Sequence, residues 1–356
     1  MSPTTSSANQ ASFPAQGRDS YWDNAKAVLV TLVVVGHALQ PSAAAGVVAA
    51  DVAYRWIYLF HMPAFVLVTG VLSAELTTRR AGRLVVGLVV PYVIFQVLQT
   101  IEVSVLRGHA APLHVLVPRW TLWYLVAVVL WRLSAPLWLA LRPTIAVVAS
   151  LALCVLGGLG AGVGHALALD DTLGFLPYFV AGLLLRNAAG LDRIGGVVAS
   201  ISRRWRVVAG LVLLAALVGT ALTRDAFNRV ALQPGFATDA VGASVGRGTL
   251  LRLILVGAAA VATVAVLVVM PRAAHWWTSV GRASIYVYLL HALVLTPLRD
   301  AEPPWTGPSV VPVVVAAAVG LALLLASHPV RRITGWAVEP GWAGSLLAPS
   351  GRAEPR

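Results

Sequence analysis

About ten apolar stretches divide this chain of 356 residues, and they limit its fold more than any other feature. Backbone polar groups cannot be left unpaired in hydrocarbon, so runs of about 20 apolar residues favour membrane-spanning helices. Only 11% of residues are charged, against about 25% in soluble domains. We therefore predict an all-α fold, a polytopic membrane helix bundle of about ten transmembrane helices. The predicted spans are residues 25–39, 56–74, 84–101, 121–140, 144–168, 173–186, 207–222, 250–270, 283–298 and 309–327.

The net charge of +12 comes from short groups of basic residues between the apolar stretches. A nucleic-acid-binding domain would gather such residues on one soluble face, so no nucleic-acid partner is expected. Most of the basic residues fall on the cytoplasmic side when the N-terminus is placed in the cytoplasm. The positive-inside rule therefore predicts an integral cell-membrane protein with both termini cytoplasmic.

The chain is predicted to contain one large domain. Residues 1–18 are polar and are expected to form a disordered cytoplasmic N-terminus. Residues 19–335 are predicted to form the membrane domain and residues 336–356 a cytoplasmic tail, which is rich in Gly, Pro and Ser from Pro340 and is expected to be disordered there. Cys154 is the only cysteine, so neither a disulfide nor a cysteine-built metal site is expected, and we predict no metal. No glycine-rich phosphate loop is present, which argues against an ATP-driven pump.

Lys26 is the only lysine, and His37 follows it by eleven residues across an almost wholly apolar segment. Eleven helical steps of 100° return to within about 20° of the starting direction, about 16 Å along the axis. The two side chains are therefore expected on one face of one helix. An ionisable pair inside a span favours a functional site. The alternative is that Lys26 is an inside-facing charge at a helix end and His37 a neutral ring bonded to a nearby carbonyl.

Three N-terminal segments carry a resemblance to a known family. The first is RDSYWDNAKAVLVTLVVVGH at residues 18–37, followed by FHMPAFVLVTG at 60–70 and TTRRAGRLVVGLVVPYVIFQ at 77–96. Together they resemble the acyltransferase 3 family, especially its sugar O-acetyltransferase branch. That family's first helix carries Arg or Lys, ten intervening residues and His, commonly after Asp-Asn. Matching residues here are Asp23, Asn24, Lys26 and His37, and weaker matches lie at residues 122–132, 175–186 and 281–291.

The resemblance implies transfer of an acyl group, expected to be acetyl, to a hydroxyl. The donor would be acyl-CoA (acetyl-CoA), a co-substrate rather than a permanently bound cofactor. The acceptor would be a carbohydrate, either a glycan or a glycosylated metabolite. A neutral imidazole can accept the hydroxyl proton, and His37 is the candidate general base. Many family members carry a Glu in the fourth region, but PRWTLWYLVAVV contains none, so no carboxylate partner for His37 is expected there.

The donor's phosphates require cations, and four basic residues are candidates for that role. Lys26 is one, unless it pairs with Asp23 one helical turn earlier as a helix-end partner. The others precede the third predicted span, where ordinary positive-inside charge is the alternative explanation. They are Arg79, Arg80 and Arg83.

Four further residues are predicted to line the cavity or hold the acceptor. His61 lies near the start of the second span, on the same predicted side of the membrane as His37. His291 and Tyr286 belong to the segment YVYLLH, and Trp123 belongs to LWYL. Other tryptophans near span ends, including Trp120, are expected in the membrane interface.

Two other functions fit parts of the pattern. In a secondary transporter or a flippase of a lipid-linked sugar, Lys26 and His37 would form a proton or substrate path. Transporters often contain inverted repeats with paired broken helices, and no such pairing is evident here. A structural protein of a polysaccharide-export complex would bind no CoA.

Overall fold

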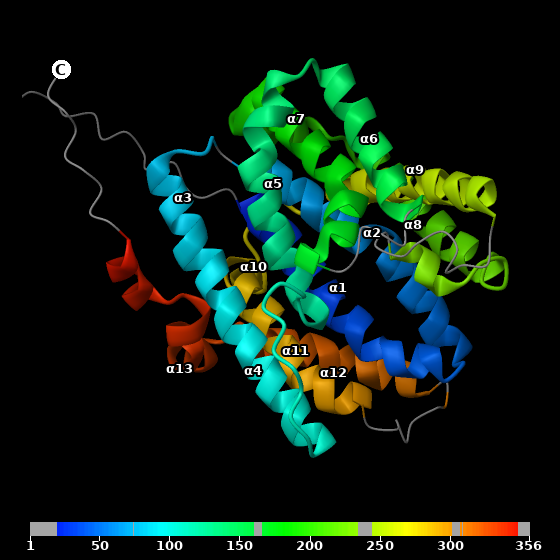
Figure 1. Cartoon of the computed structure of the whole chain (residues 1–356). Coiled ribbons are helices and arrows are strands. Elements are labelled where there is room, and N and C mark those ends of the chain that lie inside the picture. The colour runs from blue at the N-terminus through cyan, green and yellow to red at the C-terminus, as the bar shows by residue number, and fades with distance from the viewer. Residues whose placement is uncertain are drawn as a thin grey trace, which may run out of the picture.

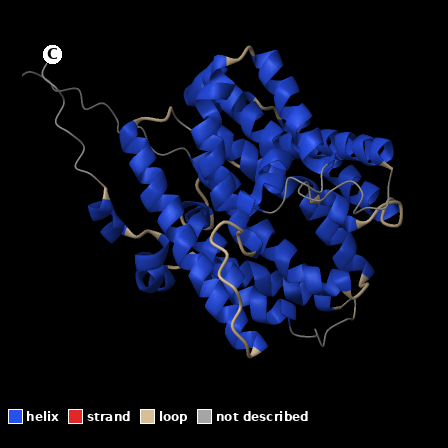
Figure 2. Ribbon diagram, in the orientation of Figure 1, coloured by secondary structure: helices blue, strands red, loops and turns tan. Residues whose placement is uncertain are grey.

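A computed structural model describes residues 20–73, 75–159, 166–233, 244–300, 307 and 309–347. The side chains of Thr78, Arg79, Asp300 and Leu346 lie outside this description, as do the predicted disordered residues 1–18. Within the described residues every regular element is a helix (Figure 2), which confirms the predicted all-α fold.

Seven helical segments of the described chain are long and apolar enough to cross a membrane. Two shorter apolar helices and one helix pair bent by 70° account for the other three predicted spans. The seven are α1 (Ser20–Ala44), α2 (Val48–Leu72), Arg80–Arg107, Trp120–Ala140, Ala166–Ser200, α8 (Arg203–Leu222) and α9 (Val245–Val269). The shorter helices are α6 (Pro143–Leu159) and α11 (Ser284–Asp300), and the bent pair joins α12 (Val310–Leu325) to α13 (His328–Val338).

Three of the long segments are composites. Arg80–Arg107 runs through α3 (Thr78–Leu84), a π-helical turn (Val85–Val89) and α4 (Val90–Arg107). Trp120–Ala140 joins the 3-10 turn η2 (Trp120–Leu122) to α5 (Trp123–Ala140). Ala166–Ser200 joins η3 (Ala166–Ala168) to α7 (Leu169–Ser200), which Gly190 interrupts with φ 71°. The remaining short elements are η4 (Arg229–Leu232), α10 (Thr278–Arg282) and η6 (Gly341–Leu346).

Two predicted boundaries were wrong. The span expected at 144–168 contains α6 (Pro143–Leu159), and residues 160–165 lie outside the described part of the chain, but residues 166–168 form the 3-10 turn η3, in which Leu167 has φ 56°. The C-terminal tail was expected to be disordered, but its Gly341–Leu346 segment forms a 3-10 helix.

Helices α1 and α2 form the centre of the bundle (Figure 1). α1 packs against α2, α10, α11 and α12, whereas α2 packs against α1, α7, α8 and α9. The apolar window of α2 is 72% buried, against 11% for α8, so α8 lies at the periphery. His37 and His61 therefore project from the two helices at the centre of the described bundle.

The α2 and α7 helices cross at a pair of glycines. A Cβ atom on Gly70 would meet the Phe179 carbonyl, and one on Gly182 would meet the Leu67 carbonyl. Small residues let helix backbones approach closely in membranes, where packing drives association. This crossing holds the part of α7 around Gly182 against the C-terminal end of α2.

Asn24 fastens the beginning of α1 to the segment before α11. Its amide donates to the Pro271 and Ala273 carbonyls at 2.9 and 2.8 Å, and its carbonyl accepts from the Thr278 hydroxyl at 2.6 Å. Gly281 lies so close that an added Cβ would overlap the Asp23 carbonyl. The Asp-Asn pair of the sequence motif thus has a structural role: it fixes α1 in the bundle.

Candidate active site

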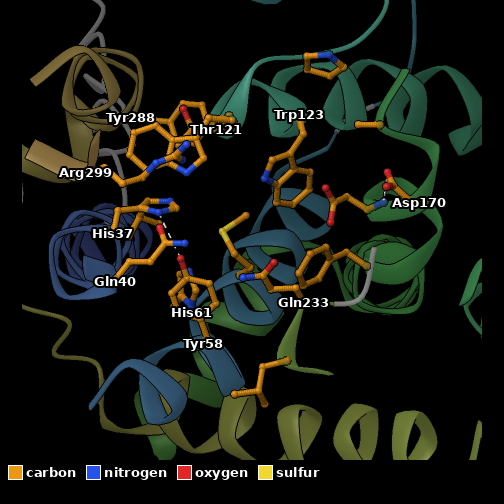
Figure 3. Close-up of a pocket in the computed structure, with 18 of the residues that line it drawn as sticks. His37, Gln40, Tyr58, His61, Thr121, Trp123, Asp170, Gln233, Tyr288 and Arg299 are labelled. Carbon is orange, nitrogen blue, oxygen red and sulfur yellow. Dashed lines mark hydrogen bonds between the residues drawn. The ribbon is translucent and has the colours of Figure 1, made fainter. Parts of the chain in front are cut away.

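A cavity of about 360 Å³ lies between α1, α2 and the start of α7 (Figure 3). The segment before α5, the η4 turn and α11 complete its wall. The volume falls within the range of small-molecule sites, about 300–1,000 Å³. Its lining residues are Val33, His37, Gln40, Tyr58, His61, Met62, Val117, Pro118, Trp120, Thr121, Trp123, Ala168, Asp170, Asp171, Phe175, Leu232, Gln233, Tyr288 and Arg299.

His37 lies at the junction of four elements. Its Nδ1 is 3.2 Å from the Tyr58 hydroxyl on α2. Its ring stacks on His291 of α11, with centroids 5.4 Å apart, and meets the Trp120 ring edge-on at 4.8 Å. The imidazole is therefore held on three sides by aromatic groups and still lines the cavity.

His61 and His291 are held differently from His37. The His61 Nδ1 donates to the Ile57 carbonyl at 2.8 Å, and the His291 Nδ1 donates to the Val287 carbonyl at 3.0 Å. Each ring therefore carries its proton on Nδ1 and presents a lone pair at Nε2. His291 is fully buried, and its Nε2 has no partner among the described residues. Of the three rings, His37 is the one whose Nδ1 meets a side-chain hydroxyl.

The Tyr58 hydroxyl belongs to a chain of polar groups. Tyr54 and Tyr58 stack with their centroids 3.8 Å apart, and their hydroxyls interact. The Gln233 amide donates to the Tyr54 hydroxyl at 2.9 Å. The segment carrying Gln233 is fastened to α2 because Arg55 donates to the Phe227 carbonyl at 3.1 Å. His37 is thus connected through two tyrosines to the 3-10 turn on the other side of the cavity.

The predicted donor-binding residues lie elsewhere. Lys26 pairs with Asp23 at 2.8 Å, as the helix-end alternative predicted. Arg80 and Arg83 line a second cavity of about 330 Å³ beside the π-helical turn, together with Arg132 of α5. The Arg132 Nε is buried and has no partner among the described residues. The Arg79 side chain lies outside the described part of the chain.

Three sequence-based placements need correction. His291 was predicted to line the cavity, but it is fully buried, stacks on His37 and is not among the lining residues. Tyr286 was predicted to line the cavity, but its hydroxyl donates to Glu339 at 2.7 Å, and Arg331 covers its ring. Tyr288, two residues later, does line the cavity, because two helical steps turn a side chain by about 200°. Trp120 was assigned to the membrane interface, but it contacts His37 and lies under the Arg299 guanidinium at 4.7 Å.

Several lining residues were missed by sequence reasoning. Gln40 and Tyr58 could have been found, because each lies three positions from a predicted histidine on the same helical face. Asp170, Asp171 and Arg299 lie at the ends of apolar stretches, where a solvent-facing position is the ordinary expectation. The cavity does contain carboxylates, and they come from α7 rather than from the fourth region. Among the described residues no group of three or more His, Cys, Asp or Glu side chains could hold a metal ion.

Comparison with known proteins decides the family. The model of an acyltransferase domain matches residues 19–327. The chain belongs to the acyltransferase 3 family. This membership confirms the predicted resemblance and supports a membrane acyltransferase rather than the transporter or export-complex alternatives.

A partial relative is also found. Nodulation protein NolL of Mesorhizobium japonicum (strain LMG 29417 / CECT 9101 / MAFF 303099) is 39% identical over 66 residues, which covers 18% of this chain and 18% of that protein. No solved structure matches the chain.

Proposed function

We propose that this membrane acyltransferase moves an acetyl group from acetyl-CoA to a hydroxyl of a glycan or glycosylated metabolite, with His37 as the general base. The observation that carries the proposal is the hydrogen bond between His37 Nδ1 and the Tyr58 hydroxyl in the wall of the cavity. A general base must be oriented by a second group while its reacting nitrogen stays free. His37 meets both requirements when its Nδ1–H group donates a hydrogen bond to the Tyr58 hydroxyl and its Nε2 acts as the base.

The reaction then proceeds by direct attack. The acceptor oxygen bonds to the thioester carbonyl carbon, and its proton passes to His37 Nε2. Collapse of the tetrahedral intermediate breaks the C–S bond, and the departing CoA sulfur takes the proton back from His37. Arg299 lines the same cavity and supplies positive charge for the developing oxyanion.

In this scheme His61 helps to hold the acceptor. Its Nδ1 proton is committed to the Ile57 carbonyl, so Nε2 can only accept a hydrogen bond. A ring in that state accepts a hydrogen bond from a hydroxyl of the acceptor and has no proton to donate to an oxyanion. We therefore assign His61 to positioning of the acceptor.

The donor's phosphates fit the second cavity. Arg80, Arg83 and Arg132 bring three guanidinium groups to one pocket, and the unpartnered Arg132 Nε gives a buried donor for a phosphate oxygen. The positive-inside assignment puts Arg80 and Arg83 on the cytoplasmic side, where acyl-CoA is available. Lys26, already paired with Asp23, contributes to this side as a neighbouring charge rather than as a phosphate ligand.

The test uses the purified protein in lipid nanodiscs with labelled acetyl-CoA and a panel of glycans. We expect label in an ester product, and His37→Gln should lower the transfer rate by about 10²–10⁴-fold, the usual contribution of a general base. His109→Gln is the matched control, because His109 is exposed and does not line the cavity. Equal rates for His37→Gln and the parent protein would remove His37 from the mechanism.

A further inference from the structure

A groove of about 480 Å³ lies between α8 and α9 and shares no lining residue with either cavity described above. Figure 1 shows these two helices beside each other on one side of the bundle. Ala209 and Ala265 are buried and form the floor of the groove, whereas Trp205, Val261 and Val264 are exposed along its edges. The full lining is Ile201, Trp205, Val208, Ala209, Val212, Ala260, Val261, Val264, Ala265 and Val268. Both helices are long and apolar enough to cross a membrane, so the groove opens towards the hydrocarbon of the bilayer.

The groove spans about half the thickness of a bilayer. α8 has 20 residues, which at 1.5 Å per residue gives about 30 Å, the thickness of the hydrocarbon core. Its lining residues begin at Ile201, just before the helix starts, and end at Val212, about 16 Å further along. Those of α9, from Ala260 to Val268, lie near the end of that helix. Consecutive spans cross in opposite directions, so the groove runs from one membrane surface to about the middle of the bilayer, the depth of one acyl chain.

Aromatic and basic side chains mark the surface end of the groove. Trp205 is 65% exposed, as expected for a tryptophan at the level of the lipid headgroups. Arg204 lies four residues before Val208, so the helical period puts it on the lining face of α8. Arg272 follows the end of α9 by three residues. Both arginines are exposed, and neither side chain forms an ion pair or hydrogen bond with a described residue.

A negatively charged lipid headgroup complements this end of the groove. Guanidinium groups bind phosphate oxygens through paired hydrogen bonds, and basic pockets between membrane helices bind acidic headgroups. The apolar part of the groove does not select among phospholipids, because the surrounding lipid chains are as apolar as its lining. Any preference for one phospholipid therefore comes from the charges at the surface end.

Two other occupants fit these charges less well. A symmetric dimer of two copies with the same orientation in a bilayer has its twofold axis along the membrane normal, so this face would meet itself and each arginine would approach its counterpart. Like charges placed in this way oppose association. The terminal segments outside the described part of the chain offer no net negative charge. Residues 1–19 contain one arginine and one aspartate, and residues 348–356 contain two arginines and one glutamate.

We propose that the groove between α8 and α9 binds one anionic phospholipid, with an acyl chain on the alanine floor and the headgroup phosphate between Arg204 and Arg272. This site is separate from the site of acyl transfer, and its test does not depend on that activity. An anionic headgroup gains about fivefold in affinity for each basic residue that it meets at the membrane surface, so two arginines should give a preference of about 25-fold.

The experiment titrates the full-length protein in detergent with phosphatidylglycerol or with phosphatidylcholine of the same chain length, and native mass spectrometry counts the lipids bound to each molecule. We expect the first phosphatidylglycerol to bind about 25-fold more tightly than the first phosphatidylcholine. The double variant Arg204→Gln, Arg272→Gln should lose that preference. The matched control is Arg203→Gln, Arg332→Gln, which removes the same charge elsewhere. Arg203 lies two helical steps, about 200°, from Trp205 around α8, and Arg332 belongs to α13.

A second variant tests the apolar part of the groove. Ala260→Phe places a ring in the groove and keeps both arginines, whereas Ala258→Phe places the same ring at an exposed position of α9 that does not line the groove. We expect Ala260→Phe to lose the tightly bound phosphatidylglycerol and Ala258→Phe to retain it. Thermal unfolding of each variant shows that it is folded.

Three results would overturn the proposal. One is equal binding of the two lipids by the parent protein. Another is a preference that survives in the Arg204, Arg272 double variant or in Ala260→Phe, or that falls as far in the matched controls. The third is a dimer of the parent protein that Ala260→Phe dissociates, because the groove would then be a contact between two copies of the chain.

Discussion

Replacing Tyr58 by Phe removes one hydroxyl and leaves the size and shape of the side chain unchanged. That hydroxyl lies 3.2 Å from His37 Nδ1 and links it to Tyr54. In the proposed mechanism this hydroxyl accepts a hydrogen bond from the His37 Nδ1–H group while positive charge develops on the imidazole. Tyr58→Phe should therefore slow the chemical step without removing any group that binds acetyl-CoA.

The expected magnitude follows from the kind of bond lost. A hydrogen bond to a charged group contributes about 1.5–3 kcal/mol, and the imidazole is charged in the transition state. Since about 1.4 kcal/mol corresponds to a factor of ten in rate, kcat should fall about 10- to 150-fold. The KM for acetyl-CoA should stay the same, because the arginine-lined cavity does not include Tyr58.

The assay measures kcat and both KM values for the parent protein, Tyr58→Phe and Tyr178→Phe. Tyr178 is a matched control, because its buried hydroxyl donates to the Val256 carbonyl at 3.0 Å rather than to a histidine. Both variants lose a hydroxyl inside the bundle, so both should lose similar stability. If Tyr58→Phe kept the parent kcat, or if Tyr178→Phe lost as much, the orienting role of Tyr58 would be refuted.

Three further predictions concern other parts of the molecule. Gly182→Ala should lower the free energy of unfolding by about 1–3 kcal/mol, because the added methyl group would press on the α2 backbone. Gly210→Ala is the control and should leave stability unchanged, because open space surrounds Gly210. Thermal unfolding in nanodiscs measures both variants, and equal melting temperatures would contradict the close crossing of α2 and α7. Asn24→Ala should lower the free energy of unfolding by about 1–3 kcal/mol in the same measurement, because two carbonyls and a hydroxyl lose their buried partner. An unchanged melting temperature would contradict the role of Asn24 in holding the start of α1 to the segment before α11. Arg83→Gln should raise the KM for acetyl-CoA about tenfold, as expected for one lost charged hydrogen bond, and should leave the acceptor KM unchanged. Arg107→Gln, at the other end of the same span, serves as the control. Equal KM values for acetyl-CoA in Arg83→Gln and the parent protein would remove Arg83 from the donor site.

The sequence predicted the fold well because lipid imposes one rule on every span. Each predicted apolar stretch contains a helix, since a backbone in hydrocarbon must pair its polar groups within the segment. The errors lie where that rule does not apply. Residues 166–168, at the end of one predicted span, form the 3-10 turn η3, and the tail segment Gly341–Leu346 forms a 3-10 turn outside the apolar stretches.

The site was only partly predictable from the sequence. His37, His61 and Trp123 were expected in the cavity because each lies in a distinctive segment of the chain, and all three line it. Asp170 and Arg299 reach the same cavity through the crossing of α2 with α7 and the packing of α11 on α1. Such encounters between distant segments depend on tertiary contacts that spacing along the chain does not encode. The prediction that Tyr286 lines the cavity was wrong because it was made from nearby residues in the sequence, and these occupy another face of the helix.

Measuring acetyl esters on the glycans of whole cells tests most directly whether acetyl transfer requires His37. Cells that lack the gene are complemented with the parent protein, with His37→Gln or with His109→Gln, at matched membrane levels. Mass spectrometry of surface glycans and secreted metabolites then looks for the mass increment of one acetyl group. We predict that the parent protein and His109→Gln restore the ester and that His37→Gln does not. Full restoration by His37→Gln, or no ester with the parent protein, would contradict His37-dependent O-acetyl transfer.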